Sequence, residues 1–263
     1  MKVTMQFTGL EKVQEQLAKL SGHQAEEAYA KAINDTAYQL RRAMQEEMQS
    51  VFDRPTPYIL KSVYIKQAEP GNLAATILPT YYGGKGVDPQ LILRAEADGG
   101  SRRDKRSEVA LRRVGILPGG YQTAVPGSPY PGSVDAYGNI KGSFLAHLIS
   151  YFQSFGEQGY RANMKDRTKA NLHARGTKTM DARRYFVSYG RLRGNRSSHL
   201  APGIWAAKGT HGVDVRPVLM FVRDGRYTQR LSMAAIAKKV DADNYLAKRL
   251  RYRIRQAAES LGS

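Results

Sequence analysis

Apolar residues at helical spacing dominate the first fifty positions of the chain. Four of them lie three or four residues apart and predict a short amphipathic helix ending before Gly22: Leu10, Val13, Leu17 and Leu20. A second apolar stripe runs from Ala28 to Val51 without any Gly or Pro inside it. An uninterrupted stripe of that length predicts one long helix with a single buried face.

A stretch with two prolines, "VFDRPTPYIL", follows this stripe. Pro55 disfavours helical conformation in the residue before it, and Thr56-Pro57 has the form of an N-cap followed by proline at the first helical position. We therefore expect the long helix to end near Phe52 and a short helical turn to begin after the break. Asp53 and Arg54 are interpreted as an ion pair at this corner.

The residues after the break alternate in the manner of a β-hairpin. Val63 and Ile65 alternate with polar neighbours, "EPGN" supplies a turn, and "LAATILP" is a second extended run. The break therefore redirects the chain from helix to sheet.

Helix signals and a long loop fill the middle of the chain. Asp88-Pro89 has the form of a helix start, and a basic segment predicts a second helix from Ser101 to Val114. Residues 115–142 are rich in Gly and Pro, and a connection of that length is usually functional or becomes ordered against a neighbour. Apolar residues then predict a helix that closes the first module: Phe144, Leu145, Leu148, Ile149 and Phe152.

The last hundred residues predict strands and a terminal helix. Residues 160–199 have weak periodicity, which indicates a mobile segment. "RYFVSYG", "GIWAAKG" and "VRPVLMFVRDGRYTQRLS" predict strands, the last two joined by a hairpin turn at Asp224-Gly225. Ser232 opens a final helix whose apolar face is Leu246, Leu250, Ile254, Ala257 and Leu261. Its other face is basic, with Lys248, Arg249, Arg251, Arg253 and Arg255.

These elements predict an α+β fold. A long N-terminal helix is expected to pack on an antiparallel sheet, followed by a basic C-terminal region of strands and a terminal helix. We place a first module, with the long Gly/Pro loop 115–142, at residues 1–155. Residues 156–263 form a second part that we expect to pack on the same core.

The distribution of charge along the chain is the composition feature that says most about possible partners. The formal net charge is +18, yet residues 1–100 hold 11 Lys and Arg against 12 Asp and Glu. Residues 160–199 hold 11 Lys and Arg against 2 Asp and Glu. Such clustering indicates nucleic acid, an anionic surface or an acidic protein as partner, because a concentrated positive potential attracts polyanions.

Composition excludes several kinds of chemistry. The chain has no cysteine, which excludes disulfides, thiolate nucleophiles and Cys-ligated zinc. The 5 histidines show no metal-ligand spacing, and no phosphate loop or nucleophile elbow is present. We expect no cofactor, metal site or enzymatic activity. Residues 1–20 lack the layout of a signal peptide, and no apolar run is long enough to span a membrane, so we expect a cytosolic origin and no membrane partner.

Three peptides, together with the helix before them, resemble a known family. They are "FDRPTPYILKSVYIKQA", "GILPGGYQTAVPG" and "DAYGNIKG", preceded by "AKAINDTAYQLRRAMQEEM". They resemble the minor tail or tail-completion proteins of long-tailed bacteriophages, a family that includes the lambdoid minor tail protein Z. The resemblance covers about the first 155 residues and contains no catalytic signature.

The resemblance implies a structural virion protein of the phage neck. It implies an α+β subunit of a homo-oligomeric ring, hexameric by resemblance to the family. Such a ring lies between the tail tube or tail terminator and the head-tail connector, around the channel for genomic DNA, and is assembled in the host bacterial cytoplasm. The family supplies no enzymatic residues.

Seven arginines are predicted to contact DNA or an acidic partner, without sequence preference. They are Arg183, Arg184, Arg191, Arg193 and Arg196 of the basic segment, and Arg249 and Arg253 of the last helix. Three other readings remain at this point. The chain could be a free, sequence-independent DNA-binding phage protein, or a metal-dependent nuclease using Asp88, Glu96, Asp98, Asp104 and Glu108. The arginines could also be ordinary solvated loop charges.

Overall fold

The chain folds as two compact units. In the computed structural model, unit 1 joins residues 1–102 to residues 227–263, and unit 2 is the intervening segment Arg103–Arg226. The structure describes residues 3–4, 22–80, 87–156, 162–176, 181–190, 199–208 and 214–260. This division differs from the predicted boundary at residue 155. The last helix packs on the first long helix, so the two segments of unit 1 lie before and after unit 2 in the sequence. The predicted helix at residues 10–20 lies outside the described residues.

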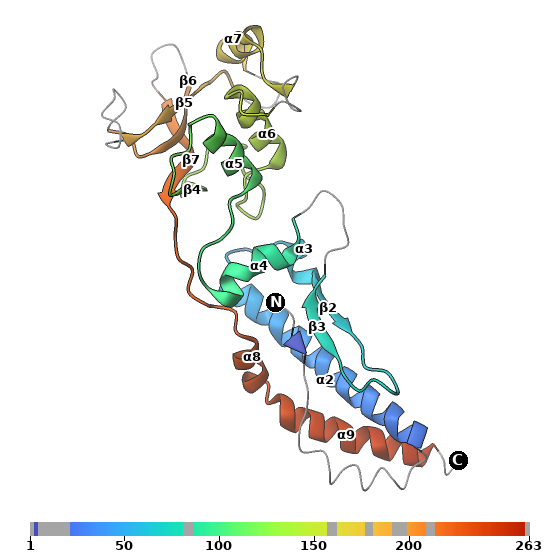
Figure 1. Ribbon diagram of the computed structural model, residues 1–263. Coiled ribbons are helices and arrows are strands. Elements are labelled where there is room, and N and C mark those ends of the chain that lie inside the picture. The colour runs from blue at the N-terminus through green and yellow to red at the C-terminus, as the bar shows by residue number, and fades with distance from the viewer. Residues whose placement is uncertain are drawn as a thin grey trace. The chain divides into compact units, whose positions relative to one another are not determined.

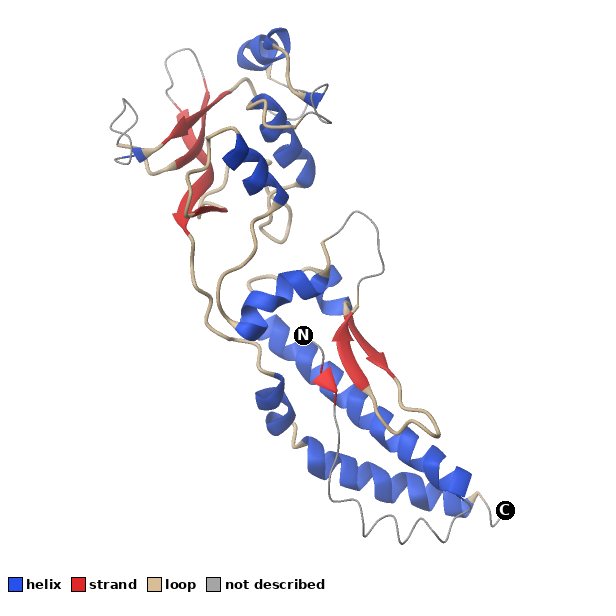
Figure 2. Ribbon diagram, in the orientation of Figure 1, coloured by secondary structure: helices blue, strands red, loops and turns tan. Residues whose placement is uncertain are grey.

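Unit 1 combines two long helices with a small antiparallel sheet (Figures 1 and 2). Its elements are β1 (Val3–Thr4), α2 (Gly22–Val51), α3 (Pro57–Lys61), β2 (Val63–Lys66), β3 (Thr76–Pro79), α4 (Pro89–Asp98), α8 (Met233–Lys239) and α9 (Ala242–Glu259). Helices α2 and α9 lie side by side (Figure 1), although some 200 residues separate them in the sequence. The expected α+β class with a long N-terminal helix is confirmed.

The buried face of α2 is the predicted apolar stripe. Its fully buried residues recur at helical spacing: Ala32, Ile33, Ala37, Leu40, Met44 and Met48. The helix ends at Val51, as the prolines predict, and α3 begins at Pro57 with Thr56 as its N-cap. At the corner between them Asp53 and Arg54 form the expected ion pair, with Arg54 Nε 3.1 Å from Asp53 Oδ1.

The predicted hairpin is confirmed and forms most of the unit 1 sheet. Strand β2 pairs antiparallel with β3, which pairs on its other side with β1. Val63, Ile65 and Ile77 are buried in the core that α2 and α9 share. Asn34 of α2 fixes the far end of the hairpin, since its side chain both donates to and accepts from the backbone of Ala68.

The single terminal helix that the sequence predicts is two helices, α8 and α9. Ser232 caps α8 as predicted, because its hydroxyl accepts a hydrogen bond from the Ala235 amide. The helix then breaks at Val240, and Asp241 takes a left-handed conformation with φ of 49° before α9 begins. Three residues of the predicted apolar face are confirmed in the core, with Leu246 and Leu250 buried and Ile254 partly buried against them.

In its described residues, unit 2 packs three helices and a four-stranded antiparallel sheet around its own core. Its elements are α5 (Arg106–Arg113), β4 (Tyr121–Ala124), α6 (Gly142–Tyr151), α7 (Asp166–Arg175), β5 (Arg184–Ser188), β6 (Gly203–Lys208) and β7 (Asp214–Arg223). The strand order is β4-β7-β6-β5. Pro217 lies in the central strand β7. The pairing register with β6 shifts there, between Ile204 and Trp205 of β6, as expected because proline has no amide donor.

Several predictions about this middle region were wrong. The Asp224-Gly225 turn does not join two strands, because the chain leaves β7 there and pairs Tyr227 with Gly100 in unit 1. The Gly/Pro-rich segment contains β4, which pairs with β7. The weakly periodic segment contains α7, and the basic helix begins at Arg106 rather than at Ser101. Pairing with distant residues explains the first two differences. The start of α5 is set locally, because the Glu108 side chain accepts a hydrogen bond from the Lys105 amide in a capping box.

Candidate polyanion-binding surface

Unit 2 carries most of the positive charge. Arg103–Arg226 holds 21 Lys and Arg against 8 Asp and Glu, out of a total excess of 18 in the whole chain. The expected concentration of charge in the back of the sequence is therefore largely a property of one folded unit. The seven predicted arginines, however, do not form one surface.

Only one of the five predicted arginines of the basic segment is described as a surface cation. Arg184 begins strand β5 and its side chain is exposed. Arg183 precedes it and is buried, with 2% of its surface accessible. Arg191, Arg193 and Arg196 lie outside the described residues.

Arg183 is an interior residue of unit 2. Its Nε donates to the hydroxyl of Tyr185 and its NH1 donates to the Asp181 carbonyl at 2.7 Å. The guanidinium also lies 5.9 Å from the ring centre of Tyr130 and 5.5 Å from that of Tyr185. A side chain so enclosed cannot reach a phosphate, so its predicted contact role does not fit the structure. The pKa of the nearby His147 is lowered, mainly by burial and also by the charge of Arg183.

Arg249 and Arg253 hold α9 against α2. Both guanidinium groups bind the carboxylate of Asp35, with Arg249 NH2 2.7 Å and Arg253 Nε 2.9 Å from Oδ2. Arg253 NH2 also donates to Oδ1 at 3.0 Å. Burial acts to raise the pKa of Asp35, but the hydrogen bonds from Arg253 and Arg249 outweigh it and hold that pKa below its usual value. These two arginines have a structural role that the sequence pattern alone does not reveal.

The opposite side of α9 presents a second set of cations to solvent. Lys248, Arg251 and Arg255 are exposed and recur about once per turn, and Tyr252 lies exposed among them. We call these four residues the α9 basic face. Among the residues that the structure describes, its three cations form no ion pair. The guanidinium of Arg249 lies 4.6 Å from the Tyr252 ring centre, so this ring sits between the structural and the exposed cations.

The geometry of this face suits a phosphate chain. Seven residues separate its end cations, a rise of about 10 Å along the helix. Successive phosphates of one DNA strand advance by about 3.4 Å along the duplex axis, so the face can follow about three of them. The signal for these residues was present in the sequence, because their three- and four-residue spacing places them away from the apolar stripe.

A second basic cluster lies on α7 and β5 in unit 2. The ammonium group of Lys169 lies 5.4 Å from the ring centre of Tyr151, whose hydroxyl is hydrogen-bonded to His173 Nε2 at 2.9 Å. The pKa of His173 is lowered, mainly by partial burial and also by the charges of Arg184 and Lys169. Lys169 and Arg184 both lie close enough to His173 to act on its charge, so this cluster brings two cations together.

The carboxylates proposed for a nuclease have other roles. Asp88 caps α4, Glu96 pairs with Arg230 and Asp104 pairs with Arg112. Glu108 is fully buried and accepts hydrogen bonds from the backbone amides of Lys105 and Thr123. Within the described ranges, no three His, Asp or Glu side chains are grouped as metal ligands would be.

Comparison with protein-family models, with curated proteins and with solved structures finds no match to this chain. None of the helices in the described part of the chain is long and apolar enough to cross a membrane.

The Asp35 cluster makes stability depend on pH. We expect Asp35→Asn to lower the free energy of unfolding by about 2 kcal/mol near neutral pH, because hydrogen bonds to charged groups contribute about this much. A carboxyl whose folded-state pKa is lowered stabilises the fold above its unfolded pKa and loses this contribution as the pH falls through the folded value. The gap between wild type and variant should therefore close in acid.

Denaturant titrations at neutral and acidic pH measure this gap. Asp53→Asn is the matched control, because Asp53 also pairs with an arginine but is largely exposed, and exposed pairs contribute little. Equal effects of the two substitutions at neutral pH would show that the Asp35 cluster is not a structural contact.

The α9 basic face should supply phosphate contacts. We expect Lys248→Gln, Arg251→Gln and Arg255→Gln combined to reduce the slope of log affinity against log salt for duplex DNA by about 2.7, because each phosphate contact contributes about 0.9. The control replaces three other exposed cations of unit 1, Arg42, Lys61 and Lys238, by Gln. Fluorescence anisotropy over a salt series measures both variants, and an equal loss in the control would remove the assignment of this face.

Proposed function

We propose that this chain is a structural protein of the phage neck, which forms a ring that completes the tail and joins it to the head connector around the DNA channel. The observation that carries the proposal is the order of elements across the resembling peptides. "FDRPTPYILKSVYIKQA" begins directly after α2 and spans the proline break, α3 and strand β2. The other two peptides supply β4 and the approach to α6.

The distribution of charge supports a position beside DNA. A channel protein must attract a polyanion without reading its sequence, and solvated lysines and arginines do this through phosphate contacts. The α9 basic face on unit 1, and Lys169 and Arg184 on unit 2, provide such cations.

Exposed apolar side chains support self-association. Val87, Leu91 and Ile92 lie at the start of α4, and each exposes close to half of its surface. Tyr58 is also exposed and donates a hydrogen bond to the Val87 carbonyl at 2.8 Å, so these residues form one neighbourhood. Grouped exposed apolar residues are typical of surfaces that are covered in an assembly.

A second function deserves a test because of the α9 basic face. The chain would then be a free DNA-binding phage protein without sequence preference, active as a monomer. The two functions differ in one property, since a neck protein associates with itself and with tail tubes even when DNA is absent.

Light scattering and negative-stain imaging with purified tail tubes and no DNA test this difference. We expect ring-shaped particles or density capping the ends of the tubes. Leu91→Gln with Ile92→Gln should abolish self-association while leaving affinity for duplex DNA within about twofold, because neither substitution changes the charge of the protein. A strictly monomeric wild-type protein that ignores tail tubes but binds DNA would favour the second function.

A further inference from the structure

Strand β2 is an open edge of the unit 1 sheet. The strand order β1-β3-β2 places β3 in the centre and leaves β2 with one neighbour among the residues that the structure describes. An edge strand offers backbone N–H and C=O groups to any extended chain that can lie beside it. The question is what this edge would bind.

The register shows which groups face outward. Thr80 N donates to the Ser62 carbonyl at 2.8 Å, and the residue pairs Tyr64–Leu78 and Lys66–Thr76 continue the same alternation. In an antiparallel pair the residues between hydrogen-bonded pairs direct their backbone groups away from the partner. The N–H and C=O groups of Val63 and Ile65 therefore point to the open side of β2.

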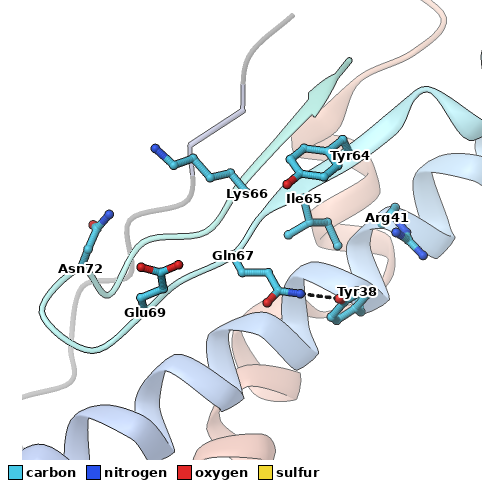
Figure 3. A pocket seen from close by; sticks show the side chains of 8 residues that line it. All are labelled: Tyr38, Arg41, Tyr64, Ile65, Lys66, Gln67, Glu69 and Asn72. Carbon is cyan, nitrogen blue, oxygen red and sulfur yellow. Dashed lines mark hydrogen bonds between the residues drawn. The ribbon is translucent and has the colours of Figure 1, made fainter. Parts of the chain in front are cut away.

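A groove of about 540 Å³ lies along this edge, between the hairpin and α2 (Figure 3). Tyr38 and Arg41 of α2 form one wall, and residues 64–67 form the other. Gln67 reaches across to donate a hydrogen bond to the hydroxyl of Tyr38, as the dashed line in Figure 3 shows. Tyr38 and Tyr64 expose 40% and 46% of their surfaces, so two aromatic rings are available to a bound chain.

The charge of the groove selects the partner. Arg41 and Lys66 line it, and neither forms an ion pair with a described residue; the Arg41 guanidinium lies 5.2 Å from the Tyr38 ring centre. Among the described residues that line the groove, Glu69 is the one carboxylate, and it lies with Asn72 at the turn of the hairpin. A bound segment would thus meet one cation on β2, one on α2 and an acidic group near the turn.

A second copy of this chain is a poor source of that segment. The chain has a net charge of +18, and nine of its carboxylates already form ion pairs within the described structure. They are Glu27, Asp35, Glu47, Asp53, Glu96, Asp98, Asp104, Asp181 and Asp214. Nucleic acid is also a poor match, because it has no peptide groups to pair with the backbone of Val63 and Ile65.

We propose that the open edge of β2 binds an extended, acidic segment of a partner protein by strand addition, with its carboxylates on Arg41 and Lys66 and its apolar side chains on Tyr38 and Tyr64. Backbone pairing supplies the register, and the charged and aromatic side chains select the sequence. This surface does not depend on the neck assignment, because it follows from the sheet edge and the groove alone.

The alternative role of Lys66 is protective. A lysine on an edge strand discourages pairing with other strands, and four residues make a short edge. Protection predicts that no extended peptide binds, whatever its charge. The proposal predicts binding that depends both on acidic side chains and on free backbone amides.

Fluorescence anisotropy with the full chain separates these outcomes. The probe is a short labelled Val-Glu peptide with blocked ends, in which pairs of Val alternate with pairs of Glu. Each face of the extended peptide then carries both side chains, as Tyr64 and Lys66 on one face of β2 require. Two comparison peptides carry Lys in place of Glu, or carry methyl groups on alternate backbone nitrogens. We expect the Val-Glu peptide to bind at least about tenfold more tightly than either, because the first loses the ion pairs and the second loses the backbone pairing.

Variants locate the binding on the groove. Arg41→Gln with Lys66→Gln should lower the affinity for the Val-Glu peptide about tenfold. Arg42→Gln with Lys238→Gln removes the same charge from exposed positions outside the groove and should leave that affinity unchanged. Circular dichroism confirms that both variants fold.

Four results would overturn the proposal. They are no binding of the Val-Glu peptide, equal binding of the methylated peptide, an equal loss in the two variants, or displacement of the peptide by a single-stranded oligonucleotide whose own affinity falls in the Arg41 and Lys66 variant. The last result would assign the groove to nucleic acid.

Discussion

The structure of unit 1 depends on the packing of α2 against α9. Asp35 on the first helix binds Arg249 and Arg253 on the second, and a shared apolar core that includes Leu40, Met44 and Leu250 lies between the helices. A further pair, Glu47 with Lys239 at the end of α8, shows that the two segments run antiparallel. The two ends of the described sequence therefore close one unit, and the 124 residues of unit 2 are inserted into it.

The packing of α9 on α2 separates the cations of α9 into a structural set and a solvent-exposed set. Helical periodicity places Arg249 and Arg253 against Asp35 and places Lys248, Arg251 and Arg255 on the solvent side. One helix can thus hold the fold together and still offer positive charge to a polyanion. The proposed neck function uses the second set, while the first set explains why simple counting of arginines misassigns the contact residues.

Sequence reasoning succeeded where the determining residues are close together. The end of α2 near Phe52, the start of α3 at Pro57, the hairpin and the Asp88 cap all follow from prolines, caps and alternation within a few residues. It failed where distant residues decide. Asp224-Gly225 has the local form of a hairpin turn, yet the residues that follow it pair with Gly100. The burial of Arg183 depends on Tyr185 two residues later and also on Tyr130, which is distant in the sequence and which no spacing rule connects to it.

The central claim, that unit 1 closes without unit 2, has a direct test. Gly100 and Tyr227 exchange two backbone hydrogen bonds of 3.0 and 2.8 Å. Deleting Arg103–Arg226 leaves Ser101 and Arg102 as a two-residue loop between them, and replacing these two residues by Asn-Gly supplies the favoured turn. We expect a helical, monodisperse protein with one cooperative unfolding transition by circular dichroism. A variant that is unfolded, or that melts without cooperativity, would contradict the central claim.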